Sequence, residues 1–355
     1  MSLSFSLLTL GTPEDDARWD MFVHAHPEST PYHLCAWGKA VQASYGFKPE
    51  YWLALNGQEI VALCPTVNMR SLKAKKSICS LPYCDLGGIL ALDDESKLAL
   101  REHILAHSAA NGITSVELRE SDSELTQASE APAGQKVRML LPLPENAEAL
   151  MAQFKSKLRS QIRKAEKNGL SFKIIKGEDI SLANTNDFYD IIAENMRLLG
   201  SPVHSKAWYQ ALIRAYGQHV YIALVYSDDI AIGAALVIKT TSKAVIPWAS
   251  TRAKYNRLAP NMLLYWAVLS EATHQQLNEF DFGRSTVGEG TFNFKKQWGC
   301  LPQKLNWQSF ENGSIKTAEH INMSSSRALI ESVWQKLPLS VTNSIGPKVR
   351  KYISL

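Results

Sequence analysis

Residues 280–299, FDFGRSTVGEGTFNFKKQWG, constrain the fold of this 355-residue chain more than any other stretch. A short apolar run over 278–282 has strand character, and a loop with three glycines follows over 283–290. Residues 291–298 have helix character and stop at Gly299. A strand, a glycine loop and a helix in this order can hold an anion, because glycines expose main-chain N–H groups and a helix start presents unpaired donors. We therefore predict an anion-binding cradle here.

The cradle is predicted to bind phosphates through Arg284, Gly288 and Gly290, and Lys295 and Lys296 add full positive charges. The alternative is a tight strand-to-helix turn with solvated lysines. The stretch contains neither G-x-x-x-x-G-K-[ST] nor G-x-G-x-x-G, so a P-loop or dinucleotide fold is unsupported. It approaches the acyl-CoA loop R/Q-x-x-G-x-G/A of N-acetyltransferases, with one extra residue before the first glycine.

Four stretches in this order resemble the FemAB-like branch of the GNAT (acyl-CoA N-acyltransferase) superfamily, in particular the FemAB-related proteins of PEP-CTERM/exosortase systems. They span most of the chain and cover residues 32–46, 80–90, 154–170 and 280–302. The resemblance implies an α/β fold with a mixed sheet, in two tandem GNAT-like domains over 1–144 and 145–312. A tail with an amphipathic helix follows over 313–355.

The resemblance also implies a transferase that moves an acyl or aminoacyl group to an amine of a cell-envelope or exopolysaccharide precursor, either small or lipid-linked. Acyl-CoA or aminoacyl-tRNA would be the donor, with no tightly bound cofactor. The Phe294-Lys295 context matches the Fem pattern, which implies that Lys295 contacts the donor's phosphate or the leaving group. The loop around Asp85 would line an acceptor site, and His204 would face the substrate cleft. The alternative is a non-catalytic scaffold of the exopolysaccharide machinery.

Residues 151–168 predict a basic amphipathic helix. Phe154, Leu158, Ile162 and Ala165 recur at helical spacing and form one apolar stripe. Arg159 and Arg163 share a polar face that we expect to bind substrate phosphates. The alternatives are an exposed solubilising face or, in the scaffold hypothesis, a docking helix over 154–168.

Asp85 and Tyr255 are the candidate acid/base or orienting groups. Asp85 lies among apolar residues before Gly87-Gly88, a pair that allows another backbone to approach closely, although its carboxylate could also cap a local turn. Tyr255 lies on a polar connection into a helix that starts at Pro260. Residues 119–135 have almost no large apolar side chains and are predicted to form a loop or linker.

Hydrophobic residues make up 45% and charged residues 20% of the chain, which is typical of a soluble globular protein, and the length suits two domains. The N-terminus lacks the basic region of a signal peptide, and no apolar run reaches the ~18 residues of a membrane span. We expect a cytoplasmic protein, with the basic tail 346–355 either packed on the body or lying on the inner membrane surface.

The five cysteines form no C-x-x-C pair, which predicts reduced thiols rather than a disulfide framework. His103 and His107 lie four residues apart on a predicted helix but lack a third ligand, so we expect surface histidines and no metal site.

Overall fold

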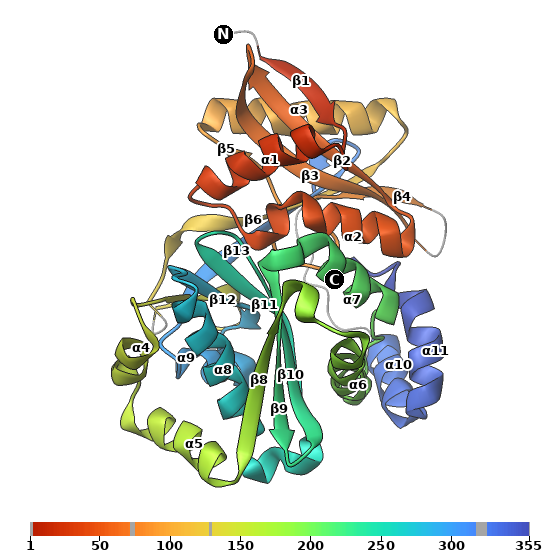
Figure 1. The fold of residues 1–355 in the computed structure, drawn as a ribbon. Coiled ribbons are helices and arrows are strands. Elements are labelled where there is room, and N and C mark those ends of the chain that lie inside the picture. The colour runs from red at the N-terminus through yellow and green to blue at the C-terminus, as the bar shows by residue number, and fades with distance from the viewer. Residues whose placement is uncertain (1–2, 72–74, 128–129, 317–324, 355) are drawn as a thin grey trace. The chain divides into compact units, whose positions relative to one another are not determined.

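The computed structural model describes residues 3–71, 75–127, 130–316 and 325–354 (Figure 1). The chain divides into two compact units. Unit 1 consists of residues 1–123, 305–322 and 351–355, and unit 2 of residues 124–304 and 323–350. Domain boundaries after residues 144 and 312 stay a prediction.

Unit 1 contains a sheet with the strand order β1-β2-β3-β4-β6-β13. The pairs β1–β2, β2–β3 and β3–β4 are antiparallel, and the pair β4–β6 is parallel. Short strands β5 and β14 pair with β3 and β13. The strands are β1 (Ser4–Leu8), β2 (Lys48–Asn56), β3 (Glu59–Arg70), β4 (Lys76–Cys79), β5 (Leu90–Ala91), β6 (Ser115–Leu125), β13 (Leu301–Glu311) and β14 (Ser314–Ile315).

Successive side chains of β2 point to opposite faces of the unit 1 sheet, and helices cover each face. Trp52 packs with residues of α3 (Asp94–Ala110), whereas the ring of Tyr51 lies 4.5 Å from that of Trp19 in α1 (Pro13–Ala25). Gly38 of α2 (Cys35–Tyr45) donates its N–H to the Tyr51 hydroxyl at 3.1 Å. A short 3₁₀ helix, η1 (Pro31–His33), precedes α2.

Unit 2 contains a sheet with the strand order β13-β7-β12-β11-β10-β9-β8. All described pairs are antiparallel except β11 with β12. The strands are β7 (Lys136–Pro142), β8 (Leu170–Lys176), β9 (Val220–Ser227), β10 (Ile230–Lys239), β11 (Lys243–Thr251) and β12 (Glu279–Thr286).

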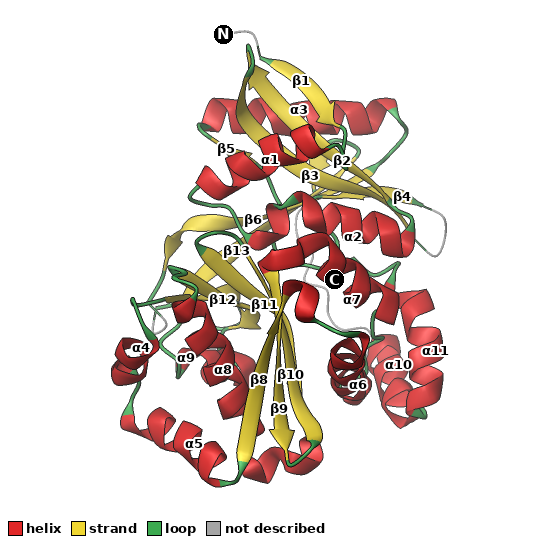
Figure 2. Cartoon of the chain, in the orientation of Figure 1, coloured by secondary structure: helices red, strands yellow, loops and turns green. Residues whose placement is uncertain are grey.

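Helices cover both faces of this sheet, with α4, α5 and α8 on one side and α6 and α7 on the other (Figure 2). Tyr221, Ala223 and Val225 of β9 alternate toward the cluster that includes α5 and α8, and the Tyr221 hydroxyl donates to Val268 O at 3.0 Å. The helices are α4 (Ala147–Gln153), α5 (Ser156–Lys167), α6 (Leu182–Leu198), α7 (Lys206–Tyr216), α8 (Pro260–His274), α9 (Gly290–Lys296), α10 (Ser325–Lys336) and α11 (Leu339–Arg350), with 3₁₀ turns η2 (Gly177–Asp179), η3 (Gly217–His219) and η4 (Ala253–Leu258).

The single helix predicted over 151–168 is wrong, because the chain is extended at Phe154 and Lys155 between α4 and α5. Arg159 explains the break: its Nη1 donates to Ala152 O at 3.3 Å and to Phe154 O at 3.0 Å, which satisfies carbonyls at the end of α4. The predicted apolar stripe is confirmed, since Leu158, Ile162 and Ala165 are buried.

The predicted linker over 119–135 is wrong in its first part, because β6 continues to Leu125 and Arg119 is buried. All five cysteines are buried and form no disulfide with one another. No helix within the described ranges is long and apolar enough to cross a membrane.

Candidate functional site

The parallel strands β11 and β12 pair over only three residues, from Lys243 with Glu279 to Val245 with Asp281. Each strand then continues beside another partner, β11 along β10 and β12 along β7, and each ladder shifts its register at this point. The causes are local, because Pro247 has no N–H to donate and Gly283 has a positive φ of 75°. Beyond Val245 and Asp281, the main chains of the two parallel strands are therefore not paired with each other.

The bulge in β12 is fastened by two charged side chains. Asp281 accepts the N–H of Gly283 at 2.7 Å, and its other carboxylate oxygen lies 3.3 Å from Nε of Arg138. Lys295 of α9 is 8% exposed, and its Nζ donates to Gly283 O at 3.0 Å and Arg284 O at 2.8 Å. Lys295 thus holds the strand, and its predicted contact with a donor stays a prediction.

The predicted glycine loop is shorter than the sequence indicated, because Gly283 and Arg284 lie inside β12. The turn that remains joins β12 to α9, and only Gly288 in it has a positive φ, of 94°. Gly290 begins α9 with an ordinary backbone, and a Cβ at either glycine would meet open space. Gly288, Gly290, Arg284 and Lys296 are all exposed.

A second candidate anion-binding element follows β11. The chain passes through η4, takes a left-handed conformation at Ala259 (φ 61°) and starts α8 at Pro260, which confirms the predicted helix start. Within the described residues no side chain caps this fifteen-residue helix. Pro260 has no N–H and the Met262 N–H donates to Ala259 O at 3.1 Å, so the positive end of the helix dipole is the feature that favours an anion here. Lys254 and Arg257 of η4 are exposed beside it.

Tyr255 lies within η4 and is half-buried. Its ring packs against the unit 2 core, with Lys254 Nζ 5.0 Å from the ring centroid. Asn168, which ends α5, donates its side-chain N–H to Leu258 O at 3.1 Å. This bond places the C-terminal end of the basic helix beside the turn that leads into α8.

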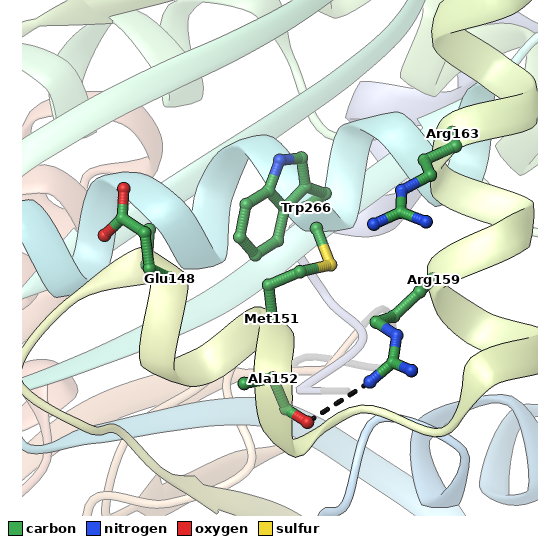
Figure 3. A pocket seen from close by; sticks show the side chains of 7 residues that line it. Glu148, Met151, Ala152, Arg159, Arg163 and Trp266 are labelled. Carbon is green, nitrogen blue, oxygen red and sulfur yellow. Dashed lines mark hydrogen bonds between the residues drawn. The ribbon is translucent and has the colours of Figure 1, made fainter.

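A pocket of about 500 Å³ lies between α4, α5 and α8. Trp266 and Met151 stand between Glu148 at one end and Arg159 and Arg163 at the other in Figure 3. Arg163 is exposed, whereas Arg159 is half-buried because it also holds the end of α4. The structure thus brings together the two arginines predicted to bind substrate and adds an aromatic wall that the sequence analysis did not include.

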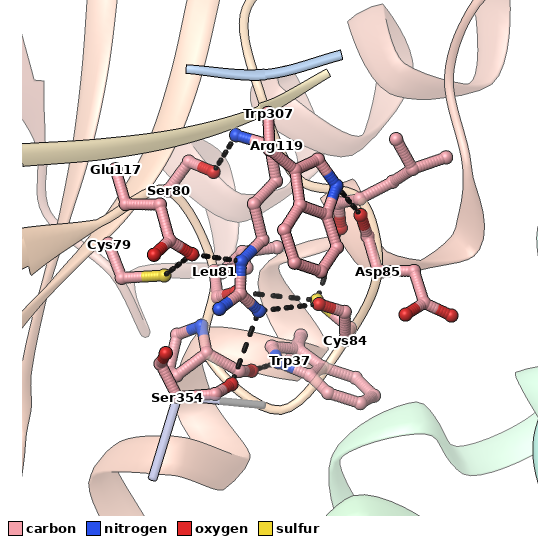
Figure 4. Close-up of polar contacts among 12 residues, drawn as sticks. Trp37, Cys79, Ser80, Leu81, Cys84, Asp85, Glu117, Arg119, Trp307 and Ser354 are labelled. Carbon is pink, nitrogen blue, oxygen red and sulfur yellow. Dashed lines mark hydrogen bonds and ion pairs between the residues drawn. The ribbon is translucent and has the colours of Figure 1, made fainter. Parts of the chain in front are cut away.

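His204 and Asp85 have different surroundings from the other candidates. His204 is 2% exposed, stacks on Trp208 at 5.4 Å and lies 5.9 Å from the Trp248 ring. Burial, with a further contribution from Arg350, holds the pKa of His204 well below its usual value. Asp85 is half-buried in unit 1, and its carboxylate points away from Arg119 in Figure 4. The predicted roles of both residues stay predictions.

Asp281, Arg138 and Trp266 were missed from the sequence. The signal for Asp281 is present, because a carboxylate between Phe280 and Phe282 in a buried strand requires partners. Trp266 gives no such signal, since its role depends on which helix packs beside it.

Comparisons with known proteins agree with this architecture. Residues 152–296 match the family model described as an acetyltransferase (GNAT) domain. The structure is similar to that of FemX, with 13% identity and a TM-score of 0.66 over 87% of this chain and 97% of FemX. It is also similar to a tandem GNAT protein from the clavulanic acid biosynthesis pathway, with 11% identity and a TM-score of 0.53 over 90% of this chain and 100% of that protein.

A third similar structure is the C-terminal domain of a protein assigned as a lysylphosphatidylglycerol synthetase from Agrobacterium fabrum. Its identity is 13% and its TM-score 0.50, over 89% of this chain and 94% of that domain. No curated protein sequence matches the chain. The chain therefore has the mixed α/β fold of tandem GNAT proteins, and its GNAT domain match lies within unit 2.

Proposed function

We propose that this protein is an N-acyltransferase or aminoacyltransferase whose reaction takes place in unit 2, where β11 and β12 separate. The early end of their pairing is the observation that carries the proposal, because the main chains of β11 and β12 stop pairing with each other after Val245 and Asp281, and β11 then leads through η4 into α8. Main-chain N–H groups where two strands separate can polarise the carbonyl of an activated acyl group while a free amine is positioned against it. The amine nitrogen bonds to the carbonyl carbon, the thioester or ester bond breaks, and the leaving group departs with a proton.

The donor, acyl-CoA or aminoacyl-tRNA, is proposed to place its phosphates at the start of α8, near Lys254 and Arg257. The helix there has fifteen residues, whereas α9 has only seven, so α8 provides the longer array of aligned peptide dipoles. The turn at Gly288 and Gly290, with its exposed cations Arg284 and Lys296, is proposed as a further contact of the same donor.

The acceptor is proposed to be an amine on a cell-envelope or exopolysaccharide precursor, small or lipid-linked, of the kind handled in PEP-CTERM systems. Its phosphate or other anionic group would bind Arg159 and Arg163 in the pocket beside Trp266. Asp85 and Tyr255 are proposed as orienting or acid/base residues, and His204 as a residue that faces the substrate. Contact with a lipid-linked precursor would bring the protein to the inner membrane surface.

Isothermal titration with acetyl-CoA, an aminoacyl-tRNA and a UDP-sugar tests the donor class. We expect acetyl-CoA or the aminoacyl-tRNA to bind, with an affinity that falls as salt is raised. Two double variants then locate the phosphates. Lys254→Ala/Arg257→Ala should weaken donor binding about tenfold or more, and more than Arg284→Ala/Lys296→Ala does. Failure of both donors to bind would contradict the proposal.

The acceptor pocket is tested with Arg163→Ala against Lys157→Ala, an equal loss of charge on the same helix outside the pocket. We expect Arg163→Ala to raise the KM for the acceptor severalfold, and Lys157→Ala to change it less than twofold. A non-catalytic scaffold that docks through α5 would behave differently, since both substitutions would weaken its binding equally.

A further inference from the structure

Arg119 in unit 1 is 1% exposed and organises the loop that contains Asp85. Its Nε lies 2.5 Å from a carboxylate oxygen of Glu117, and its Nη1 donates to Leu81 O at 3.0 Å and Cys84 O at 2.6 Å (Figure 4). The guanidinium also lies 4.8 Å from the Trp307 ring centroid. A buried guanidinium requires such partners, so loop 81–85 takes its shape from Arg119.

Residues 351–354 lie on this loop and belong to unit 1, although α11 before them belongs to unit 2. Ser354 O accepts from the Tyr83 N–H at 2.5 Å and from Arg119 Nη1 at 3.2 Å. Lys351 O accepts from the Tyr83 hydroxyl at 2.6 Å. All three hydrogen bonds end on main-chain oxygens, so the loop recognises the backbone of this segment.

Tyr83 has a φ of 70°, a left-handed conformation that is costly for a bulky residue. Both donors of Tyr83 engage residues 351–354, so the segment supports the strained residue directly. The other described anchors of the loop approach from different elements, since Trp37 Nε1 donates to Pro82 O and Trp307 Nε1 to Asp85 O, each at 2.9 Å. Between these two anchors, the backbone of residues 351–354 holds Tyr83.

We propose that residues 351–354 are a strap bound in a cradle formed by Tyr83, Arg119 and the carbonyl-lined loop 81–85. The cradle binds the turn at Lys351 and Tyr352 and the two residues after it through main-chain carbonyls, and the strap is its resident ligand. Release of the strap loosens loop 81–85 and leaves the cradle open. This inference does not depend on the transferase reaction.

Deletion of residues 351–355 from the full chain tests the strap. Hydrogen exchange measured by mass spectrometry should show at least tenfold faster exchange in a fragment that covers residues 80–88, because the Tyr83 amide loses its acceptor. Exchange in α3 should stay unchanged, which separates this effect from unfolding of unit 1. Unchanged exchange at residues 80–88 would overturn the proposal.

The peptide acetyl-Lys-Tyr-Ile-Ser-amide, which repeats residues 351–354, should bind the truncated chain and restore slow exchange. Its affinity should fall about fivefold when the truncated chain also carries Tyr83→Phe, which removes one hydrogen bond. A peptide with alanine at the position of Tyr352 should bind within twofold of the original, since recognition is through the backbone. If the alanine peptide does not bind, or the original peptide fails to restore slow exchange, the proposal that the cradle recognises the peptide main chain is wrong.

The full-length Tyr83→Phe variant provides a test that keeps the strap covalently attached. It should fold and show faster exchange at residues 80–88 than the wild type, by a smaller factor than the deletion. Exchange equal to that of the wild type would show that the hydroxyl does not help to hold the strap, contrary to the proposal.

Discussion

The ammonium nitrogen of Lys295 lies 3.0 Å from the carbonyl oxygen of Gly283, and a helix thereby fixes the bulge of the strand before it. The same nitrogen reaches Arg284 O at 2.8 Å, and Asp281 holds the Gly283 N–H from the other side. A positive charge buried at this position stabilises the carbonyls of the bulged residue Gly283 and of Arg284, which follows it. The geometry at the proposed reaction site thus depends on a side chain outside the strand.

Lys295→Met keeps the length of the side chain and removes its donors. We expect the free energy of unfolding of unit 2 to fall by about 2–3 kcal/mol, because two buried carbonyls lose a charged partner. Acyl transfer should fall as well, since the bulge shapes the end of the β11–β12 pairing. Lys296→Met on the exposed side of α9 is the matched control, and urea unfolding should show a change within about 0.5 kcal/mol. Equal stability of the two variants would contradict a holding role for Lys295.

Gly288, in the turn before α9, and Gly290, at the start of α9, allow the effect of a positive φ to be measured separately from the approach of a ligand to the main chain. Gly288→Ala should destabilise the protein by about 1–2 kcal/mol, because φ is 94° there. Gly290→Ala should stabilise it by about 0.4–1 kcal/mol, since its backbone is ordinary and the space around it is open. If a donor approaches the main chain at Gly290, this stabler variant should bind the donor more weakly. Thermal unfolding and titration on the same samples measure both effects, and undiminished donor binding would remove Gly290 from the site.

Local sequence signals predicted the features that depend on a few neighbouring residues. The burial of Leu158, Ile162 and Ala165 follows from helical periodicity, and the start of α8 from the fixed φ of Pro260. The close approach predicted at Gly87-Gly88 is confirmed, because a Cβ on Gly88 would lie 2.8 Å from Arg119 O.

Features that depend on a distant partner could not be predicted in this way. Gly283 and Arg284 look like loop residues, but β7 pairs with this segment and extends β12 to Thr286. The break before α5 depends on Arg159 bonding to carbonyls behind it. Arg119 lies in a polar run that is typical of a linker, and the folded loop 81–85 supplies two of the acceptors that permit its burial, Leu81 O and Cys84 O. In each case a long-range contact overrides the local pattern.

The five cysteines should be unreactive in the folded protein. Burial raises the pKa of every thiol, to about 12 for Cys79 and well above its usual value for Cys64, Cys84 and Cys300, and burial with nearby Asp20 raises that of Cys35. Reaction with a disulfide reagent at pH 8 should therefore proceed at less than about 1% of its rate in guanidinium chloride. Ser171→Cys on exposed β8 is the positive control and should react at once. A cysteine that reacts rapidly with the reagent in the folded wild type would show that its site opens to solvent.

The stability of unit 2 should fall as the pH is lowered from 7.5 to 5.5, because His204 is held neutral by burial and by Arg350. Its pKa is well below 6.5 in the folded state and near 6.5 in the unfolded state, so only the unfolded state takes up a proton in this range. The contribution is fully present only well above pH 6.5, and the loss by pH 5.5 is at most about 1.4 kcal/mol. Urea unfolding at pH 7.5 and pH 5.5 should show this loss of unfolding free energy in the wild type. The loss should be absent in His204→Gln, which lacks the titrating group. His274→Gln, at an exposed position, should keep the wild-type dependence. If His204→Gln keeps the wild-type pH dependence, other titrating groups cause the loss of stability. His204 would then be charged or accessible to solvent in the folded protein, as a substrate-facing residue would be.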